Sequence, residues 1–214
     1  MRPAALEYTG CATSVFGCVR SSCGIPVRPD VCGAGGDQGW QGGFVGELVE
    51  RVDEHDRVVG VVDRGTAIRM RWLHRVATVV CRDRANRILV HRRPDSDELF
   101  PSHYNWLIGG AVAVGESYQQ AARRELAEEL RIAGRPRFLF KFLCHGAIAP
   151  YWLGVHEVVI DQAVVPDPSE ISWCHWVPDT QLREVIRRWR FVPDSVDAFD
   201  RYPTVPRSGP PELG

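Results

Sequence analysis

The feature that most constrains the fold is a helix-forming stretch, Ser117–Arg131, that is flanked by strand-forming segments. It contains no Gly or Pro, and Ser117 and Gln120 stand at the two positions of an N-terminal capping box. Its apolar positions recur every four residues and predict one buried stripe. They are Ala122, Leu126 and Leu130. We therefore expect an amphipathic helix that packs against a sheet.

Short runs of strand-forming residues precede and follow this helix. The expected elements are a hairpin around Asp53–Arg57, strands over Val76–Cys81, Arg87–Arg92, Phe138–Cys144, Tyr151–Ile160 and Ile171–Val177, a second helix over Thr180–Arg190, and one or two helical turns over Asp194–Tyr202. The helices are too few for a doubly wound parallel fold. The order instead predicts an α/β sandwich around a mixed β-sheet, in a single domain over residues 47–202.

The first 46 residues differ from the rest of the chain. They hold four of the seven cysteines and ten of the twenty glycines, and they show no helical or alternating apolar period. We interpret residues 1–46 as a disordered N-terminal extension or as a segment upstream of the true start, and residues 203–214 as a Pro-rich tail. The segment lacks a secretory signal, and the domain's three cysteines fit a reducing compartment, so we predict a cytoplasmic protein.

The charge balance narrows the partners. Lys and Arg number 26 and Asp and Glu 27, a formal net charge of -1, which argues against a nucleic-acid coat or a polybasic membrane binder. No apolar run reaches the roughly 18 residues of a membrane span. We therefore predict a small-molecule partner, with no nucleic acid and no membrane. The oligomeric state stays open, with a homodimer as one alternative.

Three glutamates of the long helix predict the chemistry. Glu125, Glu128 and Glu129 are spaced i, i+3 and i+4, which projects their carboxylates onto one face. The like charges repel each other, and a hard divalent cation such as Mg²⁺ removes that repulsion. Mg²⁺ keeps several waters and meets substrate phosphates, so the spacing indicates phosphate chemistry. A solvated acidic face is the alternative interpretation of the glutamates taken alone.

Residues around these glutamates complete a longer pattern, G-x5-E-x7-R-E-U-x-E-E-x-G-U, where U is apolar. The matching residues are Gly110, Glu116, Arg124, Glu125, Leu126, Glu128, Glu129 and Ile132. This segment, 110–132, closely resembles the Nudix box of the Nudix hydrolases. One position departs, because Arg131 stands where the pattern has a helix-capping Gly. Gly134 follows three residues later, so we expect the helix to run on and end there.

The resemblance implies a role for each matching residue. Glu125 and Glu129 would be the main metal ligands, with Glu128 as a third carboxylate and Gly110 giving close backbone approach. One of the three, or a carboxylate elsewhere, would activate the attacking water; which one is not readable from the sequence. Glu116 and Arg124 would hold the cluster in shape, and Glu170 stands where many members carry a further acidic group. The cofactor would be Mg²⁺, with Mn²⁺ as the alternative.

Two further expectations concern the substrate. Arg92 and Arg93 end a predicted strand that faces the site, and we assign them to diphosphate binding, with a solvated pair as the alternative. The resemblance implies metal-dependent hydrolysis of a diphosphate linkage, with a nucleoside diphosphate linked to another group as the substrate class. Selectivity in this fold would lie in loops, here Pro94–Asn105 and Gly146–Tyr151. The physiological substrate is not encoded in any pattern that we can recognise.

The resemblance covers about residues 47–200 and is greatest to the YfcD-like branch of the family. The same layout is shared with isopentenyl-diphosphate isomerase, which is one alternative function. That enzyme needs a Cys and a His in a segment that here is NWLIGGAV, and the partner of its histidine at His74 is here Ala67. A Nudix-fold module that binds a nucleotide without cleaving it is the non-enzyme alternative.

Overall fold

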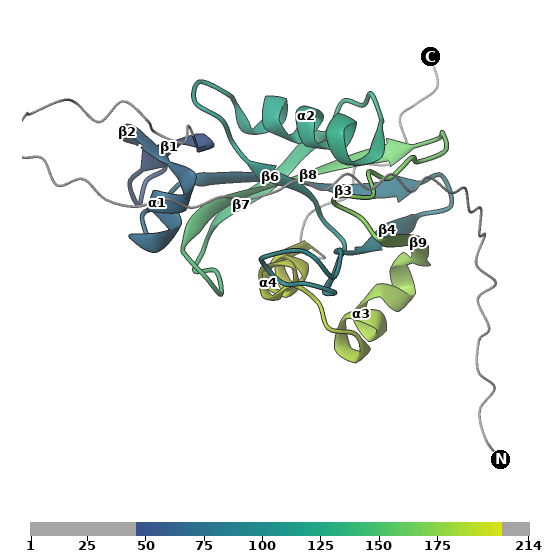
Figure 1. Cartoon of the computed structure of the whole chain (residues 1–214). Coiled ribbons are helices and arrows are strands. Elements are labelled where there is room, and N and C mark those ends of the chain that lie inside the picture. The colour runs from purple at the N-terminus through teal and green to yellow at the C-terminus, as the bar shows by residue number, and fades with distance from the viewer. Residues whose placement is uncertain (1–45, 203–214) are drawn as a thin grey trace, which may run out of the picture. The chain divides into compact units, whose positions relative to one another are not determined.

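The computed structural model describes residues 46–202, which form a mixed β-sheet with helices on both faces (Figure 1). The expectations for the first 45 residues and for the tail at 203–214 lie outside the described residues. The main sheet contains β3 (Arg75–Asp83), β4 (Arg87–Arg92), β5 (Tyr104–Asn105), β6 (Ile108–Ala111), β7 (Arg137–Cys144), β8 (Tyr151–Ile160) and β9 (Trp173–Pro178). The pair β3–β8 is parallel and the other strand pairs are antiparallel, so the predicted mixed sheet is confirmed.

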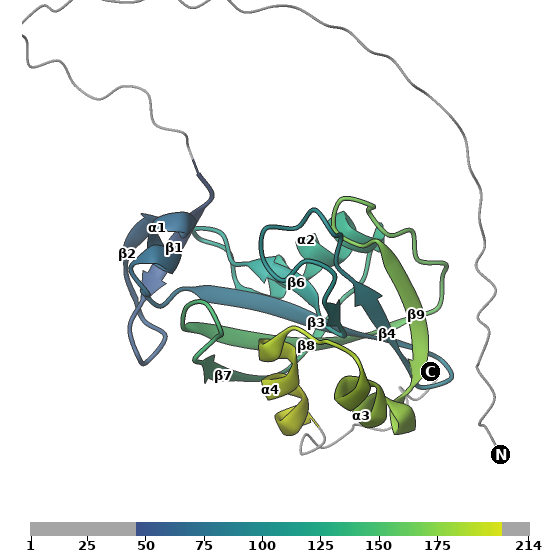
Figure 2. The same cartoon turned by 60° about the horizontal axis from the view of Figure 1, so that its bottom comes forward.

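Helix α2 (Tyr118–Leu130) covers one face of this sheet, and α3 (Asp179–Arg188) and α4 (Pro193–Arg201) cover the other (Figures 1 and 2). The apolar stripe of α2 is fully buried against Val79 and Ile108 of the sheet, as its four-residue spacing predicts. On the opposite face Trp106 is fully buried, and its indole N–H donates to the Ser195 carbonyl oxygen at 2.8 Å. That bond joins the strand layer to α4.

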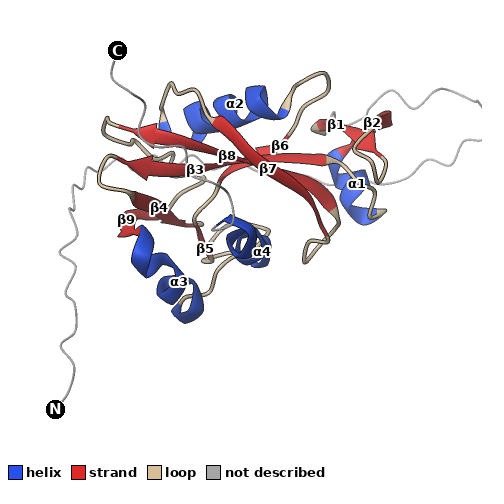
Figure 3. Cartoon of the chain, turned by 180° about the vertical axis from the view of Figure 1, so that it is seen from behind, coloured by secondary structure: helices blue, strands red, loops and turns tan. Residues whose placement is uncertain are grey.

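The predicted hairpin is present at one end of the sheet (Figure 3). Strand β1 (Leu48–Val52) pairs antiparallel with β2 (Val58–Asp63), and helix α1 (Arg64–Arg69) follows directly. Asp63 caps this helix by accepting a hydrogen bond from the Thr66 backbone N–H at 2.8 Å. Val49 and Ala67 are fully buried together with Ala111 of β6, which fixes the hairpin and α1 beside the start of the Nudix-like segment.

The start of α2 follows the prediction and its end does not. The Ser117 hydroxyl accepts from the Gln120 N–H, and the Gln120 side chain accepts from the Ser117 N–H, which completes the capping box. The expectation that the helix runs on to Gly134 is wrong. It ends at Leu130, and Arg131 itself adopts the left-handed conformation with φ 58°. Its side chain pairs with Asp167, and the following Ile132 is buried, so local contacts hold a turn that usually requires Gly.

Strand β6 was not predicted, because its Gly-Gly step carries no strand signal. It pairs with β3, with Gly109 opposite Thr78 and Gly110 opposite Ala77. A Cβ on Gly109, whose φ is +152°, would lie 2.1 Å from the Ala77 carbonyl oxygen, so only glycine allows this pairing. The strand thereby passes directly beside the glutamates of α2. None of the helices in the described part of the chain is long and apolar enough to cross a membrane.

Candidate functional site

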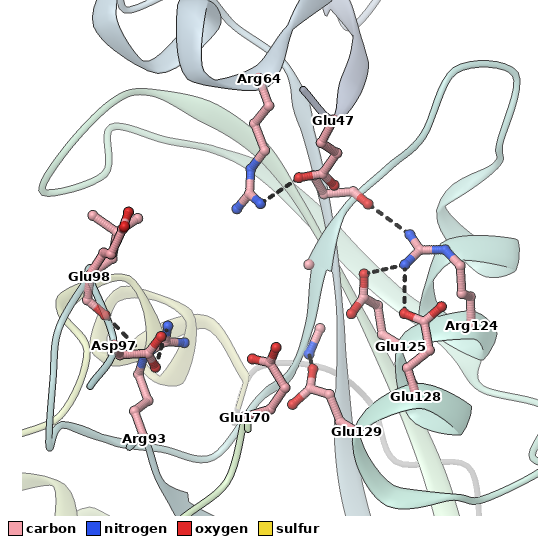
Figure 4. Close-up of a pocket in the computed structure, with 14 residues that line it drawn as sticks. Glu47, Arg64, Arg93, Asp97, Glu98, Arg124, Glu125, Glu128, Glu129 and Glu170 are labelled. Atoms are coloured by element: carbon pink, nitrogen blue, oxygen red, sulfur yellow. Dashed lines mark hydrogen bonds and ion pairs between the residues drawn. The ribbon is translucent and has the colours of Figure 1, made fainter. Parts of the chain in front are cut away.

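The glutamates of α2 line a pocket of about 510 Å³, which we call the acidic pocket (Figure 4). Its walls come from α2, β6, the residue before β1, α1, the loop after β4 and the segment before β9. The charged residues that line it are Glu47, Arg64, Arg93, Asp97, Glu98, Arg124, Glu125, Glu128, Glu129 and Glu170. Carboxylates outnumber guanidinium groups seven to three, so the pocket carries an excess of negative charge.

Arg124 connects the carboxylates on one side of this pocket. Its guanidinium donates to both oxygens of Glu116 at 3.1 Å, to Glu125 at 2.7 Å and to Glu128 at 3.1 Å. A further bond at 2.9 Å runs to the Ala111 carbonyl oxygen of β6. Burial opposes ionisation of Glu116, but the Arg124 pair, together with a hydrogen bond from the Ala113 N–H at 3.0 Å, outweighs it and lowers the pKa of Glu116. The arrangement supports the clamping role that we assigned to Glu116 and Arg124.

Glu125 and Glu129 are the buried members of the cluster. The Glu125 side chain is 12% exposed and Glu129 is 8% exposed, whereas the Glu128 side chain is 59% exposed. Burial raises the pKa of Glu125, and the charges of Glu128 and Glu47 add to the effect. Burial and the charge of Glu125 raise the pKa of Glu129 well above its usual value. Arg124 compensates part of the Glu125 charge, but among the described residues its ion pairs do not include Glu129, so ionising both side chains is costly without a further cation.

The two consecutive glycines of β6 leave space for the carboxylates of Glu125 and Glu129. The Gly109 N–H donates to Oε1 of Glu129 at 2.9 Å. A Cβ on Gly110 would lie 2.5 Å from Oε1 of Glu125, so a side chain there would displace the carboxylate. Gly110 therefore lies in the pocket as predicted, and its contribution is space and backbone rather than a side-chain ligand.

The rest of the acidic pocket is lined by groups that are distant from α2 in the sequence. Arg93 pairs with Asp97 at 2.8 Å and donates to the Leu99 carbonyl oxygen at 3.1 Å. Glu170 lies beside Glu129 (Figure 4), and burial followed by the charge of Asp97 raises its pKa. Arg93 and Glu170 thus lie where we placed them. Arg92 does not line the pocket, because its guanidinium pairs with Asp95 at 2.7 Å instead.

Sequence reasoning missed four charged residues of this pocket. Glu47 and Arg64, which pair at 2.7 Å, reach it from the hairpin and α1, and Asp97 and Glu98 reach it from the loop after β4. None of them belongs to a recognisable motif. Only the folding of the hairpin against β6 brings Glu47 to Glu125, so no local pattern could have identified it.

The donor set fits a hard divalent cation that keeps part of its water shell. The carboxylates are oxygen ligands, and burial raises the pKa values of Glu125 and Glu129 even though Arg124 pairs with Glu125, which favours a further cation beside them. Within residues 46–202 no three Asp, Glu, His or Cys side chains converge into a ready-made metal cage. Arg124 instead draws Glu125 and Glu128 together. Mg²⁺ needs only one or two carboxylates together with substrate phosphates, so this geometry fits such an ion.

A second pocket, of about 170 Å³, adjoins the acidic pocket and shares Arg64, Arg93, Leu99, Gly109 and Gly110 with it. We call it the apolar pocket, because most of its side chains are hydrocarbon. Its apolar lining consists of Ile68, Val76, Leu99, Phe100, Ile148, Ala149 and Val192. Leu99 and Phe100 come from one of the two predicted selectivity loops, and Ile148 and Ala149 come from the other.

Comparisons with known proteins agree with the resemblance seen in the sequence. The family model described as NUDIX domain matches residues 72–199. A Nudix hydrolase of Streptomyces coelicolor is 43% identical over 158 residues, which are 72% of this chain and 87% of that protein. The Nudix hydrolase YfcD of Escherichia coli is 28% identical over 159 residues, 72% of this chain and 84% of that protein.

One relative whose name states an activity and one solved structure are also similar to this chain. A prenyl-diphosphate phosphatase of Methanosarcina mazei is 28% identical over 144 residues, 65% of this chain and 84% of that protein. A crystal structure of a Deinococcus radiodurans protein superposes with a TM-score of 0.64 and 29% identity, and covers 72% of this chain and 98% of that one.

Proposed function

This chain belongs to the Nudix family, whose members hydrolyse diphosphate-containing substrates, and on that premise we propose that it hydrolyses an organic diphosphate with the help of Mg²⁺ or Mn²⁺. The observation that carries the proposal is the acidic pocket, where buried Glu125 and Glu129 share one helix face beside the glycines of β6. A bound divalent cation would neutralise charge on the phosphate oxygens and the leaving group.

We assign different roles in hydrolysis to the residues of the acidic pocket. Glu125 and Glu129, with the more exposed Glu128, would hold the cation, and Arg124 keeps Glu125 and Glu128 in register through one bond to each. One pocket carboxylate accepts a proton from the attacking water. Water adds to one phosphorus, the bond from that phosphorus to the bridging oxygen breaks, and each product carries one phosphate group. Arg93 and Arg64 lie opposite α2 and would orient the diphosphate (Figure 4).

Two classes of organic group are candidates. The sequence resemblance favours a nucleoside diphosphate linked to another group. The Methanosarcina relative is named for prenyl diphosphates, and the apolar pocket beside the acidic one is a specific observation in favour of a hydrocarbon group. The partner in either case is a small phosphorylated molecule.

The two rival functions have less support from the site. A proton-shuffling isomerase would need a thiol or an imidazole at the reaction centre, and the described residues that line the acidic pocket include no Cys or His. A binding module that does not cleave its ligand has no need to bury two glutamates whose ionisation is unfavourable. We therefore favour the hydrolase over both.

The test is Mg²⁺-dependent cleavage of the diphosphate linkage in a panel of diphosphates, followed by chromatography of the phosphate-containing products. The panel contains ADP-ribose, UDP-glucose and isopentenyl diphosphate. We expect Glu125→Gln and Glu129→Gln to lower kcat by about 10²-fold or more. Glu184→Gln, on the exposed surface of α3, is the matched control and should leave the rate unchanged. Full activity in both pocket variants would refute the assignment of Glu125 and Glu129. Binding of a diphosphate without turnover would indicate the binding module. An isomerised product without phosphate release would indicate the isomerase.

A further inference from the structure

The apolar pocket opens directly from the acidic one. Five residues line both, and two of them, Arg64 and Arg93, are the cations that face α2 across the acidic pocket (Figure 4). A diphosphate that lies between these arginines and the glutamates would therefore point its organic group toward the apolar pocket. Whatever fits that pocket decides which substrates bind.

The polar side chains of the apolar pocket already have partners within the protein. The Tyr151 hydroxyl donates to one oxygen of Asp194, and the other oxygen of Asp194 accepts from the Ala147 N–H at 3.2 Å. His74 is buried, which lowers its pKa, and its Nδ1 lies 3.3 Å from the Trp72 carbonyl oxygen. Arg64 and Arg93, which the two pockets share, pair with Glu47 and Asp97. Apart from these side chains and the glycines of β6 the lining is hydrocarbon, so the pocket offers few unpaired hydrogen-bonding side chains to a ligand.

This lining discriminates between the two candidate classes. A nucleoside brings ribose hydroxyls and base edges, and burying them without partners costs about 1–3 kcal/mol for each group. A hydrocarbon group has no hydrogen bonds to lose, and its burial against residues such as Ile68, Ile148 and Val192 is favourable in free energy. The apolar pocket therefore favours hydrocarbon over nucleoside.

The volume limits the length of the group. The apolar pocket measures about 170 Å³, close to the cavity of about 150 Å³ that is known to hold one benzene ring. A chain of about five or six carbons fills such a space, and a longer chain must extend into solvent. Building on the proposed hydrolase function, we infer that the substrate is the diphosphate of a short apolar alcohol, with the hydrocarbon group in the apolar pocket and the diphosphate in the acidic one.

The reaction on such a substrate is balanced without any further reactant. Water attacks the terminal phosphorus, and the bond from that phosphorus to the bridging oxygen breaks. The products are the alkyl monophosphate and inorganic phosphate, and the proton of the water passes to a pocket carboxylate and then to solvent.

A chain-length series tests the inference on the whole protein. We expect kcat/KM in Mg²⁺ to rise by roughly fourfold for each carbon from ethyl to pentyl diphosphate, the fold-change equivalent to about 0.8 kcal/mol per buried methylene. It should stop rising beyond about six carbons. ADP-ribose and UDP-glucose should react at least tenfold less well than pentyl diphosphate.

Variants in the apolar pocket locate the effect. Ile148→Asn and, on α1, Ile68→Asn should lower kcat/KM for pentyl diphosphate about tenfold and leave ethyl diphosphate nearly unchanged. A merely structural defect would lower both substrates together. Val165→Asn is the matched control, because Val165 is 59% exposed and lines neither pocket.

The outcomes separate this inference from the hydrolase proposal. Hydrolysis of the nucleoside diphosphate compounds with a flat response to alkyl length would overturn the inference and leave the hydrolase intact. An equal effect of both Ile148→Asn and Ile68→Asn on ethyl and pentyl diphosphate, with Tm unchanged, would likewise overturn the inference alone. Hydrolysis of no diphosphate at all would refute the hydrolase proposal and this inference with it.

Discussion

Replacing Arg124 by Met tests the electrostatic account of the acidic pocket. The change keeps most of the hydrocarbon stem and removes a guanidinium that bonds three carboxylates and the Ala111 carbonyl oxygen. Two of these carboxylates, Glu116 and Glu125, are at most 15% exposed, so they would lose their compensating charge in a poorly solvated place. The third, Glu128, is 59% exposed and contributes little.

The magnitude follows from these contacts. A hydrogen bond to a charged group contributes about 1.5–3 kcal/mol, and the one-third exposure of Arg124 reduces the combined effect of its bonds. We expect Arg124→Met to lower the free energy of unfolding by about 2–3 kcal/mol at pH 7, or Tm by about 4–12 °C. The free energy of unfolding should be measured in the presence of EDTA, because a bound divalent cation would replace part of the lost positive charge.

The stability difference between wild type and Arg124→Met should depend on pH. Arg124 holds the pKa of Glu116 below its usual value, so the stabilisation is present above the unfolded pKa and is lost as pH falls through the folded one. The difference between wild type and variant should therefore shrink below about pH 4. Arg123→Met on the same helix is the matched control, since Arg123 makes only a 3.4 Å bond to the Gly134 carbonyl oxygen among the described residues. Equal losses for the two variants in urea denaturation at pH 7 would refute the reasoning.

Three smaller predictions follow from single contacts. Gly110→Ala should leave the circular dichroism spectrum intact and lower kcat/KM more than tenfold, because its Cβ displaces the Glu125 carboxylate. Arg131→Gly should raise the free energy of unfolding in urea by about 0.5–1 kcal/mol, since relief of the left-handed conformation outweighs loss of the exposed Asp167 pair. Burial lowers the pKa of His91 to about 4, so the native state resists its protonation. Wild-type Tm should therefore fall more steeply than that of His91→Gln as pH drops from 6.5 to 4, and parallel curves would contradict this.

The sequence predicts the parts of the site that are encoded locally. Spacing within α2 places its glutamates on one face, and the capping box fixes where the helix starts. The hairpin and strands β4 and β8 follow from runs of β-branched residues, and the predicted bounds of both strands are confirmed. These features depend on neighbours within about four residues, which a pattern records directly.

Features that depend on distant partners were not predictable. Strand β6 exists because its glycines fit against Ala77 and Thr78 of β3, and glycine alone signals no strand. The left-handed Arg131 breaks a local rule, and its contact with Asp167 forms only once the loop before β9 has folded. The acidic pocket shows the same limit, since the hairpin brings in Glu47 from 78 positions before Glu125.

The charge excess of the acidic pocket links stability to function. Burial and the neighbouring Glu125 charge raise the pKa of Glu129, so folding favours its protonated form and stability falls as pH rises from the unfolded pKa toward the folded one. Glu129→Gln keeps an oxygen that accepts the Gly109 N–H and removes the charge. We therefore expect this variant to be more stable than wild type in EDTA at pH 8, by a margin that disappears toward pH 4. The Glu129 carboxylate would then be needed for hydrolysis and would at the same time destabilise the fold. Such a trade-off is expected at a site whose buried charges attract cations. A variant that loses both activity and stability at pH 8 would show that Glu129 instead supports the structure.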